Sequence, residues 1–210
     1  MPDGMGVGLF LAAALVIALT PGPGIFYVAA RSMAGGRREG LASSLGTALG
    51  GLFHVLAGAC GVAVLLMASA EAFALFKFLG ALYLVYLGIK TWREAGAAPL
   101  AFALSATGFT RAFKEGIVVE ALNPKTAAFF LAFIPQFVGL GDDGVALRFV
   151  LYGLTSVVLN TGVDVVVVLA AASFRDRLAC RPGLVRRLRR GAAAILCGLG
   201  LSLAFARRPG

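Results

Sequence analysis

Residues 116–137 read GIVVEALNPKTAAFFLAFIPQF, and the fold class follows from this stretch. It is mostly apolar, and it is long enough to cross about 30 Å of hydrocarbon as a helix. Asn123, Pro124 and Lys125 interrupt it near the middle. A proline removes a helical hydrogen bond and clashes with the preceding turn, and a lysine inside a membrane needs a partner or a role. We interpret the stretch as a broken membrane-spanning helix.

The remainder of the chain has the same apolar character. Of its 210 residues, 60% are hydrophobic and 14% are charged, and the mean hydropathy is +0.91. A soluble globular domain is about 45–50% apolar and about 25% charged. Three cysteines are too few for a secreted module held together by disulfides. We therefore predict an all-α polytopic membrane protein that is not an enzyme.

Six apolar stretches predict six transmembrane helices. The last has only 16 residues between Arg190 and Arg207, so it can span if these arginines extend to the membrane surface or if the bilayer thins locally. The six stretches run from about 7 to 30, 41 to 69, 72 to 89, 116 to 138, 145 to 174 and 191 to 206.

Basic residues fall in alternate loops of this arrangement. The loops after the first, third and fifth stretches hold 14 of the 19 Lys and Arg residues, whereas the loops between them hold Glu71, Asp142 and Asp143. Loops rich in Lys and Arg stay in the cytoplasm. Six spans then place both termini in the periplasm. The net charge of +9 is explained by this topology, and we expect no nucleic-acid partner.

A short internal repeat relates the two halves of the chain. Residues 20–29 read TPGPGIFYVA and residues 123–132 read NPKTAAFFLA, so that Pro21 aligns with Pro124. Each decamer lies in the first helix of a three-helix half, and an odd number of helices makes the second half enter from the opposite face. The pattern predicts two inverted three-helix repeats, a common architecture of secondary transporters. Their bounds are 1–94 and 113–210, with a cytoplasmic linker at 95–112.

Helix breaks at matching positions of two halves point to a binding site at the middle of the membrane. Freed backbone groups there can bind the ammonium and carboxylate of a substrate, and a lysine can bind the carboxylate. The alternative is that both breaks are structural kinks. The candidate substrate-binding residues are Thr20, Pro21, Gly22, Pro23, Gly24, Asn123, Pro124 and Lys125.

Three ionisable residues within the apolar stretches are candidates for proton coupling: Asp164, His54 and Glu120. Asp164 has no cation near it in the sequence, so it is expected to be protonated, to face water or to pair with Lys125 across the bundle. Two alternatives are open. Asp164 and Lys125 can form a purely structural ion pair, and His54 can serve only as an interhelical hydrogen-bond partner.

The chain resembles the LysE/RhtB-type amino-acid exporters. The resemblance rests on Pro21-Gly22-Pro23, the glycine-spaced run 37–51, the string KFLGALYL at 77–84 and, above all, residues 116–137. It implies a small six-helix exporter of amino acids in the bacterial inner membrane, driven by the membrane potential or a proton gradient. Glu120 departs from the neutral residue that the resemblance leads us to expect before Asn-Pro-Lys.

We therefore expect a secondary transporter that exports amino acids or related small zwitterions, coupled to protons or to the membrane potential. Its expected partners are an amino acid and the lipid bilayer, with a homo-oligomer left open, and it needs no cofactor or metal. Two other classes are weighed. A metal-ion exporter needs clustered ligands, and a membrane thiol–disulfide carrier needs two cysteines that can meet, whereas Cys60, Cys180 and Cys197 are scattered.

Overall fold

The computed structural model describes residues 4–68, 106–138 and 144–179, together with scattered positions between 75 and 93 and between 183 and 201. Within these ranges every element is helical. The predicted third and sixth spans lie largely outside the described residues. Among the described residues, two helical stretches are long and apolar enough to cross a membrane, Pro23–Gly61 and Val145–Ala171, and a bent pair of helices makes a third.

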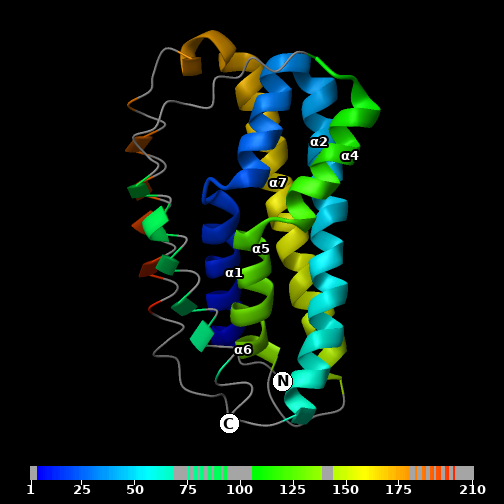
Figure 1. The fold of residues 1–210 in the computed structure, drawn as a ribbon, viewed down its shortest axis with the longest axis vertical. Helices are drawn as coiled ribbons and strands as arrows, with labels where there is room; N and C mark the ends of the chain where they lie inside the picture. The colour runs from blue at the N-terminus through cyan, green and yellow to red at the C-terminus, as the bar shows by residue number, and fades with distance from the viewer. Residues whose placement is uncertain are drawn as a thin grey trace.

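The first broken helix consists of α1 (Gly4–Leu19) and the start of α2 (Pro23–Ala68), separated by residues 20–22. Within α2, Gly36 has a φ of 69°, a left-handed conformation that glycine adopts without steric cost. The chain reverses there, so α2 has a first limb (23–35) and a second limb (37–68). In Figure 1 the first limb continues upward from α1, and the second limb returns beside α4.

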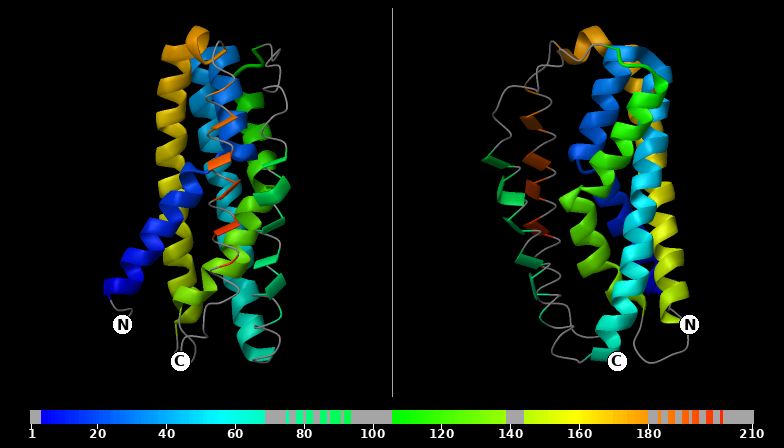
Figure 2. Two further views of the ribbon diagram at one scale, coloured as in Figure 1. Left: turned by 90° about the vertical axis from the view of Figure 1, so that its left-hand side faces the viewer. Right: turned by 45° about the vertical axis from the view of Figure 1, so that its right-hand side comes forward.

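The second broken helix begins with α4 (Phe109–Ala121) and continues after Asn123 as α5 (Pro124–Ala128), a π-helical turn (Phe129–Phe133) and α6 (Pro135–Val138). Its two parts meet at an angle of 41°. It runs in the opposite direction to the first broken helix, as the views in Figures 1 and 2 agree.

Helix α4 begins at Phe109, inside the linker that we predicted at 95–112. The backbone N–H groups of Thr107 and Gly108 donate to one carboxylate oxygen of Glu39, at 2.7 and 2.6 Å. An acidic side chain at a helix start satisfies free N–H groups and interacts favourably with the helix dipole. A residue distant in the sequence thus stabilises this start, which explains why local composition misplaced it.

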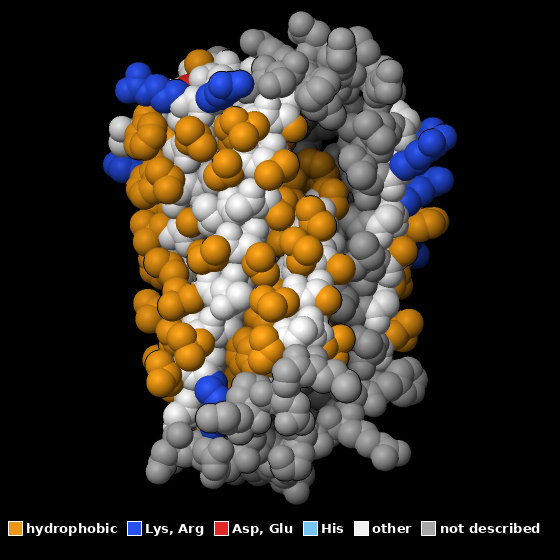
Figure 3. All heavy atoms as spheres, turned by 180° about the vertical axis from the view of Figure 1, so that it is seen from behind, with side chains coloured by type: hydrophobic (Ala, Val, Ile, Leu, Met, Phe, Trp, Pro, Cys, Tyr) orange, Lys and Arg blue, Asp and Glu red, His pale blue; other side chains and the backbone are white. Residues whose placement is uncertain are grey.

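Helix α7 (Val145–Ala179) completes the described bundle and packs along α2 and α1. Large apolar side chains cover its outer face: Leu147, Val158 and Val166 are each more than 60% exposed. Figure 3 shows an apolar flank of this kind, with most of its Lys and Arg side chains toward the upper end and some near the lower end. Such a band fits contact with lipid. We call the end with Arg37, Arg38, Arg111 and Lys114 the basic end.

The second limb of α2 and α4 approach each other through glycines. A Cβ atom on Gly46 would collide with the carbonyl oxygen of Phe113, and one on Gly50 would lie 2.6 Å from that of Ile117. On the facing helix, a Cβ on Gly116 would lie 2.6 Å from the Ser43 carbonyl oxygen. Gly46 and Gly50 are four residues apart, the spacing of small residues that lets two helix backbones approach closely.

We expect Gly46→Ala to lower the midpoint of thermal unfolding in detergent by at least several degrees, because the added methyl group forces the two backbones apart. Gly61→Ala is the matched control, since a Cβ there meets no atom within 4 Å. That control should leave the midpoint unchanged or raise it slightly through helix propensity. Equal midpoints for the two variants would contradict the close packing.

Candidate functional site

The break in the first helix leaves backbone carbonyl groups without their regular donors. Pro21 has no N–H to donate to the carbonyl of Ile17, four residues earlier. In the structure the side chain of Lys125 supplies a donor: its Nζ lies 3.1 Å from the Ile17 oxygen and 2.9 Å from the Thr20 oxygen. The lysine of one broken helix thus stabilises the break in the other.

Gly22 gives the lysine room to make this contact. The Lys125 side chain is 3% exposed and crosses directly over Gly22, where a Cβ would lie 3.3 Å from two of its methylene carbons. The ammonium uses two of its three N–H donors on the carbonyls of Ile17 and Thr20. One donor therefore remains for a further acceptor.

The second break is organised by Asn123, which is 2% exposed. Its side-chain oxygen accepts from the backbone N–H of Lys125 at 3.1 Å, as an N-cap of α5 does. Its Nδ2 donates to Glu120 at 2.9 Å, and the Thr126 hydroxyl donates to the other Glu120 oxygen at 2.6 Å. This residue set fixes the orientation of a carboxylate inside the bundle.

Glu120 lies where the two breaks meet. Its side chain is 4% exposed, and one of its oxygens would be 2.6 Å from a Cβ on Gly24. Because the helix bends after Leu122, Glu120 and Lys125 both turn toward the first break instead of lying on different faces of one straight helix. Gly24 therefore permits the first limb of α2 to approach this carboxylate.

Asp164 on α7 is 5% exposed and accepts a hydrogen bond from the hydroxyl of Thr47 at 2.8 Å. Of the three arrangements expected for Asp164, a direct ion pair with Lys125 is not the one this structure has, because no ion pair joins these two described residues, and Asp164 instead lines a small cavity. The ammonium of Lys125 interacts electrostatically with Asp164 and Glu120 but bonds to backbone carbonyls instead. The freed carbonyls lie closer to the lysine than either carboxylate does, which is a consequence of the break.

A small cavity separates the two buried carboxyl groups. Its volume is about 10 Å³, room for about one water molecule. An amino acid therefore fits only if the helices move apart. Its polar lining residues are Thr47, Glu120, Thr126, Asn160, Thr161 and Asp164.

His54 lies beside this cavity and does not line it. Its Nε2 donates to the backbone carbonyl of Glu120 at 2.9 Å, and its ring packs near Phe130. This contact is the interhelical hydrogen bond that the sequence offered as the alternative to a proton relay. Thr47 and Thr126, which sequence reasoning missed, have no motif around them, and a lone hydroxyl in an apolar helix is too common to be a signal.

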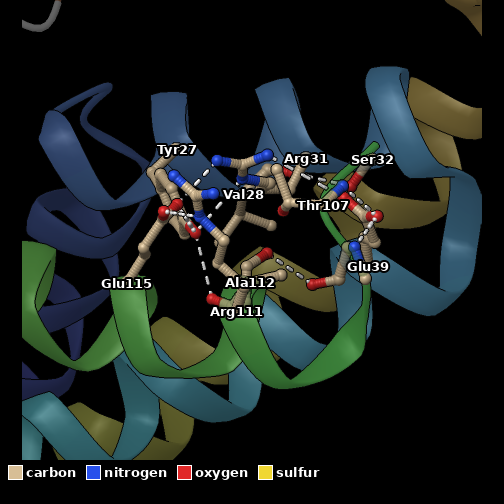
Figure 4. Close-up of polar contacts among 12 residues, drawn as sticks. Tyr27, Val28, Arg31, Ser32, Glu39, Thr107, Arg111, Ala112 and Glu115 are labelled. Atoms are coloured by element: carbon tan, nitrogen blue, oxygen red, sulfur yellow. Dashed lines mark hydrogen bonds and ion pairs between the residues drawn. The ribbon is translucent and has the colours of Figure 1, made fainter. Parts of the chain in front are cut away.

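A second polar cluster lies toward the basic end, around Arg31 (Figure 4). The guanidinium of Arg31 donates to Glu115 at 2.6 Å and lies 3.9 Å from Glu39. The hydroxyl of Tyr27 donates to the Ala112 carbonyl or to Glu115, each at 3.0 Å, and accepts from Arg31 at 3.2 Å.

From the sequence, Arg31 counts only as one of the basic residues in the loop after the first apolar stretch. In the structure it is 4% exposed and lies within the first limb of α2. Its charge is therefore neutralised inside the bundle instead of in a loop. Arg111 adds an exposed contact to Glu115 at 2.7 Å. We call the set Tyr27, Arg31, Glu39, Arg111 and Glu115 the Arg31 network.

The aromatic end of the bundle lies on the other side of the cavity. Phe10 of α1 packs on Tyr152 of α7 with ring centroids 4.5 Å apart, and on Phe137 at 5.4 Å. Phe129 and Phe133 stack at 5.2 Å. The cavity thus has an ionic closure toward the basic end and an aromatic closure toward the opposite end.

Comparison with known proteins places this arrangement in a family. The model of the LysE type translocator family matches residues 15–207. The homoserine/homoserine lactone efflux protein of Salmonella typhimurium is 31% identical over 201 residues, which cover 94% of this chain and 95% of that protein. The leucine efflux protein of the same organism is 27% identical over 147 residues, 70% of this chain and 69% of that protein. No solved structure matches. The chain belongs to the LysE family of translocators.

Proposed function

We propose that this protein exports amino acids or related small zwitterions from the cytoplasm as a secondary transporter, and that it binds them between its two helix breaks. The observation that carries the proposal is the contact of Lys125 with the carbonyl groups of Ile17 and Thr20, which brings both breaks to one point. The efflux activities named for the relatives support the direction and the substrate class.

Glu120 and Asp164 line the cavity and Lys125 does not, but the three side chains together offer complementary charges for a zwitterion. The remaining N–H donor of Lys125 binds the substrate carboxylate. Glu120 and Asp164, both buried and both facing the cavity, bind the ammonium. The hydroxyls of Thr47 and Thr126 lie beside these carboxylates, and their oxygens keep lone pairs that can accept from the ammonium.

Asp164 is the proton carrier in this proposal, with Glu120 and His54 as the other candidates. Asp164 has Thr47 as a neutral hydrogen-bond partner and no cation in contact within the described part of the chain. A carboxyl group in that setting can be neutral in one state and charged in another, at a cost that a bound ammonium or a proton offsets.

The proposed membrane architecture is six spans in two inverted three-helix repeats, in the bacterial inner membrane with both termini periplasmic. The opposite directions of the two broken helices support it (Figure 2). The cluster of Arg37, Arg38, Arg111 and Lys114 at one end supports a cytoplasmic location for that end. The first repeat and the second, which begins at Phe109, then each contribute one broken helix.

The test is efflux from proteoliposomes of the purified protein loaded with a labelled panel that includes homoserine, leucine, lysine and glutamate. We expect neutral amino acids to leave the proteoliposomes faster than they leave protein-free liposomes loaded with the same panel. An imposed pH gradient should raise this rate further. If no amino acid of the panel leaves the proteoliposomes faster than it leaves the protein-free liposomes, the proposal is contradicted. Efflux of divalent metal ions alone would favour the metal-exporter alternative.

A further inference from the structure

The Arg31 network lies between the basic end and the cavity. On α4, Glu115 precedes the cavity residue Glu120 by five residues, which is about 7.5 Å of helix toward the basic end. On the first limb of α2, Arg31 lies seven residues beyond Gly24, about 10 Å in the same direction. A solute that moves from the basic end to the cavity between these helices must pass the network.

The two limbs of α2 are attached to α4 in different ways. The second limb meets α4 backbone to backbone at Gly46 and Gly50, where there is no space for a side chain. At the level of the Arg31 network, side-chain contacts connect the first limb to α4. They run from Tyr27 to the Ala112 carbonyl and from Arg31 to Glu115. The second limb is therefore the fixed partner of α4, and the first limb is the one that can separate from it.

Non-helical residues bound the first limb at both ends. Residues 20–22 separate it from α1, and Gly36, with a φ of 69°, separates it from the second limb. A few residues of this kind at the ends of an element are what a hinge motion uses. The limb of residues 23–35 is thus a short rigid helix between two hinges.

The chemistry of the network suits a contact that opens and closes. Arg31 and Glu39 are each about 4% exposed, and Glu115 is one-third exposed. Buried ion pairs add little net stability because desolvation opposes their attraction, and on opening water solvates the separated charges. At the other end the contacts are aromatic, such as that of Phe10 with Tyr152. If those rings separated, water would not replace the contact that they lose.

We propose that the first limb of α2 is the cytoplasmic gate of this transporter, and that Arg31 holds it closed through Glu115 and Glu39. The gate opens when the limb turns about residues 20–22 and Gly36, and the cavity then receives substrate from the basic end. This proposal rests on the proposed export function for its direction, but the closed contact is tested without substrate.

The experiment uses a reporter cysteine between the network and the cavity. Ser44 is 1% exposed and lies one turn from Thr47 toward the basic end. Ser44→Cys is introduced after Cys60, Cys180 and Cys197 are replaced by serine. Labelling by a membrane-impermeant maleimide is followed in inside-out vesicles, where the cytoplasmic face is outside.

Glu115→Gln and Arg31→Gln should each raise the rate of labelling at the reporter by about tenfold, because the closed state loses its charged contact. Arg111→Gln is the matched control for Arg31→Gln: it removes the same positive charge and a bond to Glu115, but Arg111 is 68% exposed and does not join the first limb to α4. It should change the rate by less than about twofold. Tyr27→Phe, which removes a hydroxyl and no charge, should give an intermediate increase.

Export measurements separate a gate from a structural contact. The Glu115→Gln variant should reach the membrane with an unchanged melting midpoint but export with a lower maximal rate, because its gate no longer closes behind the substrate. Unchanged labelling in Glu115→Gln and Tyr27→Phe would overturn the gate, whatever is found for export. If Glu115→Gln and Tyr27→Phe raise the labelling rate but the wild-type protein exports no amino acid, the gate is retained and the proposed function is rejected.

Discussion

Lys125→Met is expected to reduce export about 100-fold while the protein still reaches the membrane. Each charged hydrogen bond lost from a buried site costs about 1.5–3 kcal/mol, and each 1.4 kcal/mol is a factor of ten. The lysine makes two such bonds to the first break, to Ile17 and Thr20, and in our proposal a third to the substrate carboxylate. The measurement is the initial efflux rate per molecule of protein in proteoliposomes.

Two further variants distinguish binding from a general loss of charge. Lys114→Met removes an exposed lysine from α4 and should leave export unchanged. Gly22→Ala keeps the lysine but places a methyl group 3.3 Å from its side chain, so it should displace the ammonium and reduce export by about tenfold. Export within twofold of the wild-type rate in Lys125→Met would show that the contact between the breaks is only structural.

Asp164→Asn should lose most of the stimulation of export by a pH gradient, while substrate exchange without a gradient persists. An asparagine is nearly the same size and its side-chain oxygen still accepts from Thr47, at 2.8 Å in the native protein, but it cannot carry a proton. The expected drop in gradient-driven efflux is at least about tenfold, with exchange reduced less than about threefold.

Both rates are measured on one preparation, so that poor reconstitution affects them equally. Because Asp164 makes no direct ion pair with Lys125, the variant should fold without a compensating change at Lys125. If Asp164→Asn is poorly expressed and is restored by Lys125→Met, the two residues depend on each other structurally. Full stimulation by the pH gradient in Asp164→Asn would exclude Asp164 as the carrier.

The positions of the helix breaks could be predicted from the sequence because proline and glycine act locally. Pro21 and Pro124 remove backbone donors wherever the chain takes them: Pro21 lies in the break between α1 and α2, and Pro124 is the first residue of α5. The close approach at Gly46 and Gly50 was also readable, since small residues four apart allow helix backbones to meet. The start of α4 was misplaced because Glu39, a residue far away in the sequence, stabilises it.

The partners of the charged side chains could not be predicted in the same way. Spacing along one straight helix separates Glu120 from Lys125, but the bend between them turns both toward the first break. Pairing of Asp164 with Lys125 was one of the expectations because no cation lies near Asp164 in the sequence. In the folded bundle a hydroxyl and two carbonyl groups lie closer.

The sequence by itself determined that this is an apolar helical protein with two broken helices, because hydropathy and proline chemistry are properties of short segments, and the resemblance of residues 116–137 pointed to the LysE type. Only the tertiary structure decided that Lys125 closes the first break, that Glu120 lies between the breaks, and that Arg31 is buried among carboxylates instead of in a loop. The contacts of Arg31 with Glu115 and of Lys125 with Ile17 join residues 84 and 108 positions apart, and no local preference encodes the partner of a charge. Packing sets them, since a buried polar group takes whichever partner the neighbouring backbone brings within reach.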